Sequence, residues 1–315
     1  MKIVFCGTPS FAVPTLKAVL RAGHDVELVV TQPDRPSGRG MVLAAPPVKA
    51  TALLAGVPVV QPEKIKRNAE FRAQLEGIVP DAILVVAYGR IIPAWMLDLP
   101  RFGNLNLHAS LLPKYRGAAP IQWAVANGEP ETGATTMRLD EGLDTGEILM
   151  QRALAIAPDQ TSADLFPLLA EMGAALMVET LAGLATGSVI PAKQDDALAT
   201  HAPILTREDG RIDFSRPAME IYNRWRGFQS WPGAWTLLVG KKLVAHRLMP
   251  FDAGALSGDA GEPGVLRVDQ GRMYVGCGAA TWLELVEVQL EGKKRMPAAD
   301  FLRGHALQSG DRLGE

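Results

Sequence analysis

The 315-residue sequence has little cysteine: only Cys6, inside an apolar run, and Cys277, between two glycines. Two such residues provide neither a disulfide framework nor the spacing of metal ligands. The N-terminus carries one cation and a brief apolar run, and we expect no apolar stretch close to the ~18 residues of a membrane span. These absences predict a cytoplasmic protein without a bound metal and without membrane association.

The sequence also lacks an excess of charge of one sign. Its 32 Lys and Arg and 34 Asp and Glu give a formal net charge of −2. This balance excludes binding of nucleic acid through whole-chain charge, so any polyanionic partner must be met by local cations. Residues 206–315 carry a net +1 against −3 for the rest, which favours the C-terminal part only slightly.

No internal repeat or low-complexity segment is present, and 48% of the residues are hydrophobic. The length is typical of two domains. In the first part, near-continuous apolar strands alternate with helices, the first of which we expect Ser10 to cap. This alternation predicts an α/β, Rossmann-like domain whose mostly parallel sheet is covered on both faces. The strands are expected at 2–6, 25–31, 57–60, 82–87, 134–139 and 147–156, and the helices at 10–23, 47–55, 68–78 and 161–183.

The second part has a different pattern. One helix at 217–226 is followed by short strands separated by glycine turns, a spacing that fits a small antiparallel barrel or sandwich. Of the two we expect a barrel of the OB-like kind, whose faces and loops suit nucleic-acid backbones. We therefore predict a catalytic domain over 1–203, a linker over 204–208 and a C-terminal barrel domain over 209–315.

The first strand-to-helix turn lacks the dinucleotide fingerprint. That pattern needs three glycines at G-x-G-x-x-G spacing, and only Gly7 is present in Cys6-Gly7-Thr8-Pro9-Ser10. The glycine is better explained as the residue that lets the strand turn into the helix. A nicotinamide-dependent dehydrogenase is therefore disfavoured.

Polar residues alternate along the segment 104–110. In an extended chain Asn104, Asn106, His108 and Ser110 share one face, with leucine and alanine between them. Asn supplies an uncharged donor and acceptor, and His exchanges protons near neutral pH. The pair suits a reaction in which an oxyanion develops and a proton moves.

A second candidate segment, which is acidic, follows about thirty residues later. Asp140, Glu141 and Asp144 alternate with Gly142 and Gly146 in a tight loop. The spacing, and the lack of an acidic residue at the closing position, argue against a calcium loop. An isolated acidic residue on a surface usually only interacts with solvent. The loop therefore indicates a functional site only in combination with the polar segment 104–110.

Together these segments resemble the signature of formyltransferases that use 10-formyltetrahydrofolate. The resemblance is carried by 106–113, 133–136 and 140–146. The stretches 3–12, 31–40 and 114–122 are similar to the members of that family that act on methionyl-tRNA. The similarity continues through 212–214, 231–232 and 292–294, so it covers essentially the whole chain.

The resemblance implies transfer of a formyl group from 10-formyltetrahydrofolate to the amino group of methionyl-initiator-tRNA by a monomeric enzyme. It implies Asn106, His108 and Asp144 as catalytic residues. It also implies a folate-contacting run formed by Ser110, Leu111, Leu112 and Pro113. Local cations would then bind the tRNA phosphates; the candidates are Arg35, Arg39, Lys293, Lys294 and Arg295.

Two alternatives remain open at this point. An enzyme of the same family that acts on an amino sugar nucleotide, or that hydrolyses the formyl-folate, would keep the same three residues. A non-enzymatic RNA-binding protein would bind tRNA without turnover, but it would leave Asn106, His108 and Asp144 unexplained.

Overall fold

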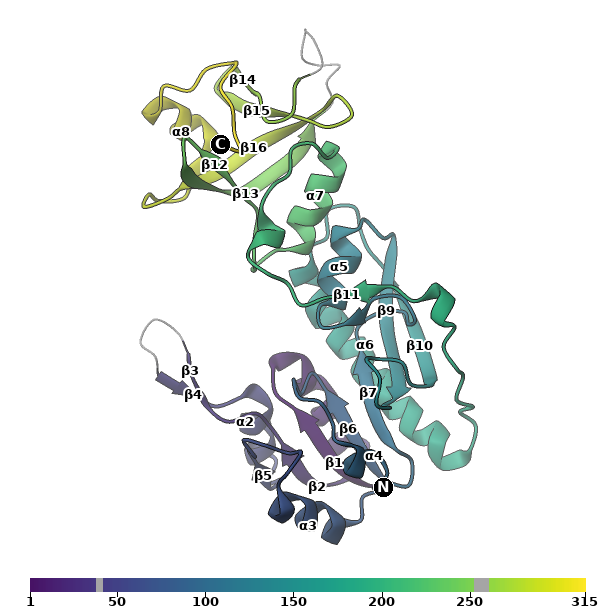
Figure 1. Ribbon diagram of the computed structural model, residues 1–315. Helices are drawn as coiled ribbons and strands as arrows, with labels where there is room; N and C mark the ends of the chain where they lie inside the picture. The colour runs from purple at the N-terminus through teal and green to yellow at the C-terminus, as the bar shows by residue number, and fades with distance from the viewer. Residues whose placement is uncertain (38–41, 252–260) are drawn as a thin grey trace. The chain divides into compact units, whose positions relative to one another are not determined.

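The computed structural model describes residues 1–37, 42–251 and 261–315 (Figure 1). The chain forms two compact units. Unit 1 consists of Met1–Pro120, Glu131–Ala155 and Leu165–Pro203, and unit 2 of Ile121–Pro130, Ile156–Asp164 and Ile204–Glu315. Two short segments of the first 203 residues thus group with unit 2. The domain limits drawn from the sequence stay a prediction.

Unit 1 is built on a seven-stranded sheet of order β10-β9-β7-β6-β1-β2-β5. The five strands from β7 to β5 run parallel, and β9 and β10 add an antiparallel edge. The predicted α/β, mostly parallel sheet is confirmed. The strands are β1 (Lys2–Gly7), β2 (Asp25–Val30), β5 (Val59–Val60), β6 (Ala82–Val86), β7 (Asn104–His108), β9 (Glu131–Arg138) and β10 (Ile148–Ala155).

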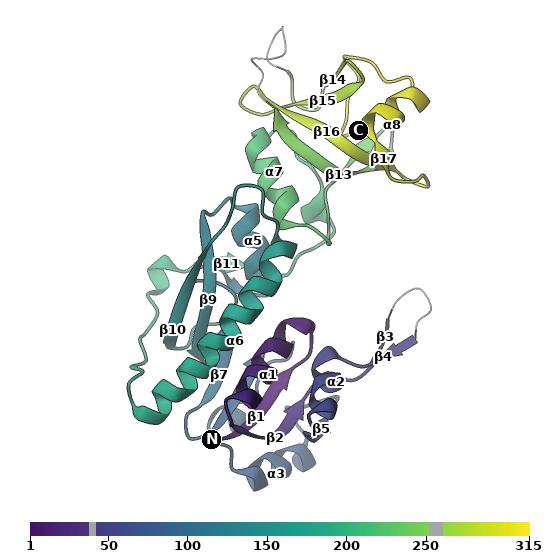
Figure 2. The same cartoon turned by 180° about the vertical axis from the view of Figure 1, so that it is seen from behind.

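Helices cover both faces of this sheet. Those of unit 1 are α1 (Val13–Arg21), α2 (Pro47–Leu54), α3 (Ala69–Ile78), α4 (Ala94–Leu97) and most of α6 (Ser162–Thr186). Phe71 and Leu75 of α3 and Met96 of α4 pack against Val4 and Val85 on one face. The alternate strand residues point to the other face, along which α1 and α6 run (Figure 2).

Local sequence explains two helix starts. Asn68 caps α3, because its side-chain oxygen accepts the backbone N–H of Phe71 at 3.0 Å. The prediction that Ser10 caps the first helix is wrong. Ser10 opens a short 3-10 turn, Ser10–Ala12, and α1 begins only at Val13 with Pro14 in its first turn. The fixed φ of proline starts this helix without a side-chain cap.

Helix α6 corrects one sequence expectation. It has 25 residues and a mean hydropathy of 1.5 in its most apolar window, so length and composition alone would allow it to cross a membrane. A buried helix of a globular core passes the same test, and 56% of that window is buried. Its apolar character is explained by packing in unit 1: Phe166 meets Phe11 edge-on at 5.1 Å, and Gly173 lies against Leu107.

Unit 2 contains the antiparallel sheet β12-β13-β16-β15-β14, with β17 paired to β16. Its hydrophobic core gathers residues from the strands and from α7 and α8, among them Ile221, Leu248 and Phe301. The predicted antiparallel β-domain is confirmed. The elements are α5 (Pro120–Ala126), which begins in unit 1, α7 (Ala218–Gly227), β12 (Trp235–Leu238), β13 (Lys241–Phe251), β14 (Leu266–Asp269), β15 (Arg272–Cys277), β16 (Thr281–Leu290), β17 (Met296–Pro297) and α8 (Ala298–Gly304).

Residues 310–315 connect the two outer strands of this sheet. Asp311 and Leu313 exchange backbone hydrogen bonds with Leu266 and Gly264 beside β14. Gly314 then donates to the carbonyl of Leu237 in β12 at 2.9 Å. The last residues therefore satisfy the edges that an open sheet would leave unpaired, which gives the sheet its barrel character.

Candidate functional site

Strand β7 carries the polar run to the carboxyl end of the parallel strands. Leu107 faces α6, whereas Asn106 lies beside Val85 and Met137 of the neighbouring strands. Asn104 is buried and donates its amide to the carbonyl of Met96 at 2.7 Å, so its role is to hold α4. The side chain of Asn106 is half-buried and makes no hydrogen bond within the described residues. Its amide is available to a ligand.

His108 closes the same strand and is only 5% exposed. Its Nε2 lies 2.8 Å from the carbonyl oxygen of Tyr115. Because a carbonyl only accepts, Nε2 carries a hydrogen in this arrangement. The other ring nitrogen, Nδ1, faces Asp144 Oδ2 at 3.7 Å. This distance is too long for a direct hydrogen bond, so a substrate group or water could join the two.

Asp144 lies in the predicted acidic loop, in the left-handed region with φ of 53°. A non-glycine residue in this region costs of order 1–3 kcal/mol and persists only where its surroundings hold it. One such contact is the backbone N–H of Gly117, which donates to Asp144 Oδ2 at 2.8 Å. Within the loop, Asp140 accepts the hydroxyl of Thr145 and the N–H of Gly142.

The structure thus brings Asn106, His108 and Asp144 to one edge of the sheet, from β7 and the loop after β9. The loop can approach closely because Gly146 has no side chain: a Cβ there would overlap the carbonyl oxygen of Arg138.

The run 110–113 follows β7 directly. Ser110 and Leu112 are buried, and Thr135 ties both: its hydroxyl donates to the Ser110 carbonyl at 2.6 Å and accepts from Leu112 N at 3.2 Å. Leu111 and Pro113 are half-exposed. Of the four residues, these two offer side-chain surface to a ligand.

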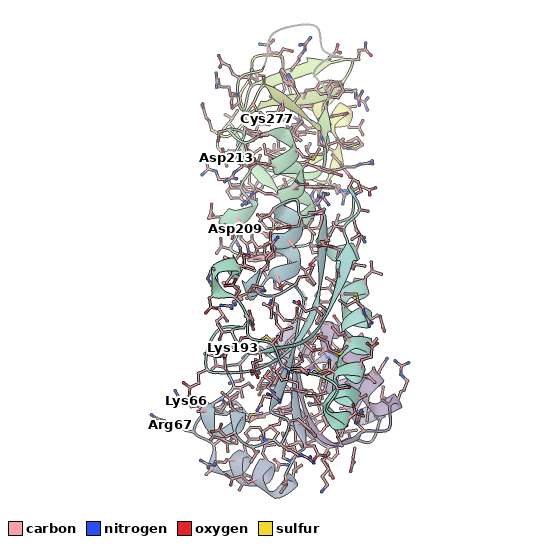
Figure 3. All side chains as sticks on the ribbon, turned by 90° about the vertical axis from the view of Figure 1, so that its right-hand side faces the viewer. Lys66, Arg67, Lys193, Asp209, Asp213 and Cys277 are labelled. Carbon is pink, nitrogen blue, oxygen red and sulfur yellow. The ribbon has the colours of Figure 1, made fainter. Side chains whose placement is uncertain are left out.

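Sequence reasoning missed the residues that support this site from outside. Arg116 and Gly117 form a two-residue strand, β8 (Arg116–Gly117), which pairs with β11 (His201–Ala202). Lys193, which is labelled in Figure 3, directly precedes Gln194 in the sequence. Gln194 donates its amide to the carbonyls of Asp144 and Gly146. Arg116 and Gly117 lie inside the stretch 114–122 that carries part of the resemblance, although no role was expected for them. Nothing in the sequence pattern indicated Gln194.

The candidate RNA contacts are at separate places. Arg35 is exposed in β3 (Arg35–Ser37), which pairs with β4 (Val42–Ala44), and Arg39 lies outside the described residues. At the base of this hairpin Asp34 accepts two hydrogen bonds from Lys49 Nζ at 2.9 and 2.8 Å and one from Gln61 at 2.7 Å. These contacts, led by Lys49, lower the pKa of the Asp34 carboxyl.

The second set lies on the turn between β16 and β17. Lys293 and Lys294 are exposed, and Arg295 forms an ion pair with Glu287. Lys293 and Lys294 therefore form no ion pair with a carboxylate in the part of the chain that the structure describes. No cluster of three His, Cys, Asp or Glu side chains suited to a metal occurs among the described residues.

Comparison with known proteins assigns the family. Residues 1–181 match the formyl transferase family model, and residues 204–306 match the model of the formyl transferase C-terminal domain. A methionyl-tRNA formyltransferase of Acidobacterium capsulatum is 72% identical over 314 residues, covering 100% of both chains. The chain belongs to the formyltransferase family, among its methionyl-tRNA formyltransferases. A second relative of that description, from Koribacter versatilis, is 60% identical and covers 100% of this chain and 99% of its own.

Solved structures agree with the fold of this family. WlaRD, a sugar 3N-formyl transferase crystallised with dTDP and 5-N-formyl-THF, superposes with a TM-score of 0.64 at 19% identity, covering 93% of this chain and 99% of its own. HypX from Aquifex aeolicus, in complex with tetrahydrofolic acid, gives 0.61 at 18% identity, covering 96% of this chain and 47% of its own. At these identities the likeness shows the fold alone.

Proposed function

We propose that this enzyme transfers the formyl group of 10-formyltetrahydrofolate to the α-amino group of methionyl-initiator-tRNA, giving N-formylmethionyl-tRNA for translation initiation in the cytoplasm. The observation that carries the proposal is the juxtaposition of Asn106, His108 and Asp144 in a chain whose full-length relatives are methionyl-tRNA formyltransferases. The solved formyltransferase crystallised with 5-N-formyl-THF supports a folate as the donor.

Asn106 stabilises the oxygen on which charge develops. The formyl group on the donor is amide-like and therefore a poor electrophile, and attack by the amine turns its oxygen into an oxyanion. The unpartnered amide N–H of Asn106 can donate to that oxygen. Removing one such donor typically costs about 10²–10³ in kcat.

His108 moves the proton that the reaction must transfer. As the new C–N bond forms, the attacking nitrogen loses a proton, and as the old C–N bond breaks, the departing folate nitrogen gains one. With Nε2–H held by Tyr115, Nδ1 is the ring nitrogen that can accept and return this proton. The Asp144 carboxylate, facing Nδ1, stabilises the imidazolium that forms in between.

The remaining candidates bind substrate. Leu111 and Pro113 offer apolar surface to the folate beside Ser110 and Leu112, whose backbone is fixed by Thr135. Arg35 of β3 and Lys293, Lys294 and Arg295 on the β16–β17 turn would meet tRNA phosphates, as would Arg39, which lies outside the described residues. All of these residues belong to one chain, and we propose that the enzyme acts as a monomer.

A formylation assay with charged initiator tRNA and 10-formyltetrahydrofolate tests the proposal. Asn106→Ala and His108→Ala should each lower kcat by roughly 10²-fold or more while folate affinity changes little. His24→Ala, on the turn after α1, is the matched control and should keep full activity. Turnover of an amino sugar nucleotide but not of methionyl-tRNA, or normal kcat in both variants, would overturn the proposal.

A further inference from the structure

A segment between α6 and residue 204 supports the candidate active site. We define residues 192–202 as the strap. It begins at Ala192, which bridges to Ile148 of β10, and ends with β11, which pairs in parallel with β8. The match to the formyl transferase family ends at residue 181, and the match to the C-terminal domain family begins at residue 204. The strap therefore lies between the two matched regions. It nevertheless contacts both partners of His108.

The first of these partners is Asp144, which the strap holds through Gln194. Gln194 Nε2 donates to the Asp144 carbonyl at 2.8 Å and to the Gly146 carbonyl at 2.7 Å. The same Asp144 accepts Gly117 N–H on its carboxylate. Backbone and side chain of Asp144 are therefore fixed at once, which explains how a non-glycine residue stays in the left-handed region.

Arg116 sets the orientation of the Gln194 amide. Its Nε and Nη2 donate to Gln194 Oε1 at 3.0 and 2.8 Å. A guanidinium has only donors, so the amide oxygen must face it and the amide NH₂ must face the two carbonyls. Arg116 is only 5% exposed, whereas its ion-pair partner Asp196 is 82% exposed. The buried guanidinium is thus directed at Gln194.

The second partner is the Tyr115 carbonyl, which the strap holds through Thr200. The Thr200 hydroxyl oxygen accepts Tyr115 N–H at 2.9 Å, and the Thr200 carbonyl accepts Arg116 N–H at 2.9 Å. Tyr115 is itself in the left-handed region, with φ of 62°. Its carbonyl is the acceptor for His108 Nε2.

We propose that Gln194 and Thr200 are positioning residues for the formyl-transfer reaction: the strap holds the Asp144 carboxylate and the Tyr115 carbonyl on the two nitrogens of His108. The inference rests on the proposed roles of His108 and Asp144. The hydrogen bonds of the Gln194 side chain go to Asp144, Gly146 and Arg116, so we expect its effect on kcat to pass through the position of Asp144.

Gln194→Glu separates positioning from general stability. The variant keeps its size and its contact with Arg116, but it replaces an NH₂ that donates to two carbonyls with an oxygen that repels them. We expect kcat to fall roughly 10²-fold, the loss that a misplacement of about 1 Å can cause. KM for methionyl-tRNA should stay within about twofold. Asp196→Asn, which touches the same guanidinium from the exposed side, is the matched control and should keep wild-type kcat.

A double-mutant cycle provides the decisive readout. If Gln194 acts through Asp144, Gln194→Glu should cause no further loss in an Asp144→Asn background, measured by single-turnover formylation. An equal loss in both backgrounds would show a general structural effect and overturn the inference. Normal kcat for Gln194→Glu beside a strongly impaired Asp144→Asn would also overturn it. Normal kcat for Asp144→Asn would overturn the inference together with the role of Asp144, whereas a wild-type enzyme that does not formylate methionyl-tRNA would reject the proposed function.

Thr200 gives an independent test should Gln194→Glu fold poorly. Thr200→Val keeps the shape but removes the acceptor for Tyr115 N–H, so kcat should fall at least tenfold, with a thermal transition that remains cooperative. Thr200→Ser keeps the hydroxyl and should restore most of the activity. Equal kcat for the valine and serine variants would contradict the role of the hydroxyl.

Discussion

Gly117 is restricted to glycine by two independent features. Its φ is +123°, a conformation that side chains rarely adopt, and a Cβ there would lie 2.6 Å from the carbonyl oxygen of Ala202. Its N–H is also the donor to Asp144. A substitution of Gly117 should therefore affect the pairing of β8 with β11 and the position of Asp144 at the same time.

Gly117→Ala should destabilise the protein and impair formylation together. The methyl group would push β8 away from β11, and overpacking of this kind typically costs about 1–3 kcal/mol beyond the conformational penalty. Gly23→Ala is the matched control, because Gly23 also has a positive φ but no atom within 4 Å of the added Cβ. Urea unfolding and kcat would be measured for both. An equal loss of stability in the two variants would contradict the steric argument.

The two cysteines should be unreactive in the folded protein. Burial raises the pKa of the Cys6 thiol well above its ordinary value and that of Cys277 to about 12. Since the thiolate is the reactive form, a thiol-specific reagent at pH 8 should label neither residue until guanidinium unfolds the chain. Labelling of native protein at the rate of the unfolded chain would show that one of these sites opens.

At the residue scale, the sequence could predict what depends on short-range pattern. Period-two alternation placed Asn106 and His108 on one face of a strand, and the structure has them there. It could not predict Gln194, because its contact with Asp144 spans 50 residues and an isolated glutamine carries no local signal. Ser10 shows the opposite error, a local signal that the structure does not use. Serine is a common capping residue, but α1 begins at Val13, where Pro14 fixes the backbone of the first turn.

At the scale of elements, the β3–β4 hairpin depends on contacts at its base. Lys49 and Gln61 hold Asp34 directly before the hairpin, and Gln61 also donates to the Gln32 carbonyl at 2.8 Å. Since these contacts lower the pKa of Asp34, its stabilisation is present above the ordinary pKa of an aspartate. It is lost as the pH falls through the lowered value.

Asp34→Asn should loosen the hairpin without disturbing the reaction. We expect KM for methionyl-tRNA to rise several-fold while kcat and the KM for the folate stay near wild type. Asp25→Asn is the control, because Asp25 is exposed in β2 and has no side-chain partner among the described residues. An unchanged KM for methionyl-tRNA in Asp34→Asn would show that the hairpin does not contribute to RNA binding.

The long elements followed from the sequence, whereas the short strands β8 and β11 did not. An apolar run such as 82–87 predicts a buried strand, because both faces of a strand in a fully covered sheet are buried. The structure has β6 at Ala82–Val86. The two-residue strands β8 and β11 have no such run. Their pairing depends on the tertiary structure, because it joins Arg116 and His201 across 85 residues of chain.

At the scale of the whole molecule, residues 310–315 should determine the stability of unit 2. A chain ending at Ser309 loses the backbone hydrogen bonds to Leu266 and Leu237 and the buried side chain of Leu313. We expect the calorimetric transition of unit 2 to shift to lower temperature. Leu313→Ala keeps the backbone bonds and should cost only the side-chain contribution of about 2–5 kcal/mol. An unchanged transition in the shortened chain would contradict closure by this segment.

The pairing of β8 with β11 also sets an order of events during synthesis. The two strands lie 85 residues apart, so closing this contact requires a long loop and follows the local pairings of the sheet. A nascent chain that has emerged only as far as α6 would contain Asn106, His108 and Asp144 but not the strap. Unit 1 would then become competent only when residues near 202 leave the ribosome, so formyl transfer would require the strap as well as the segments that carry the three residues.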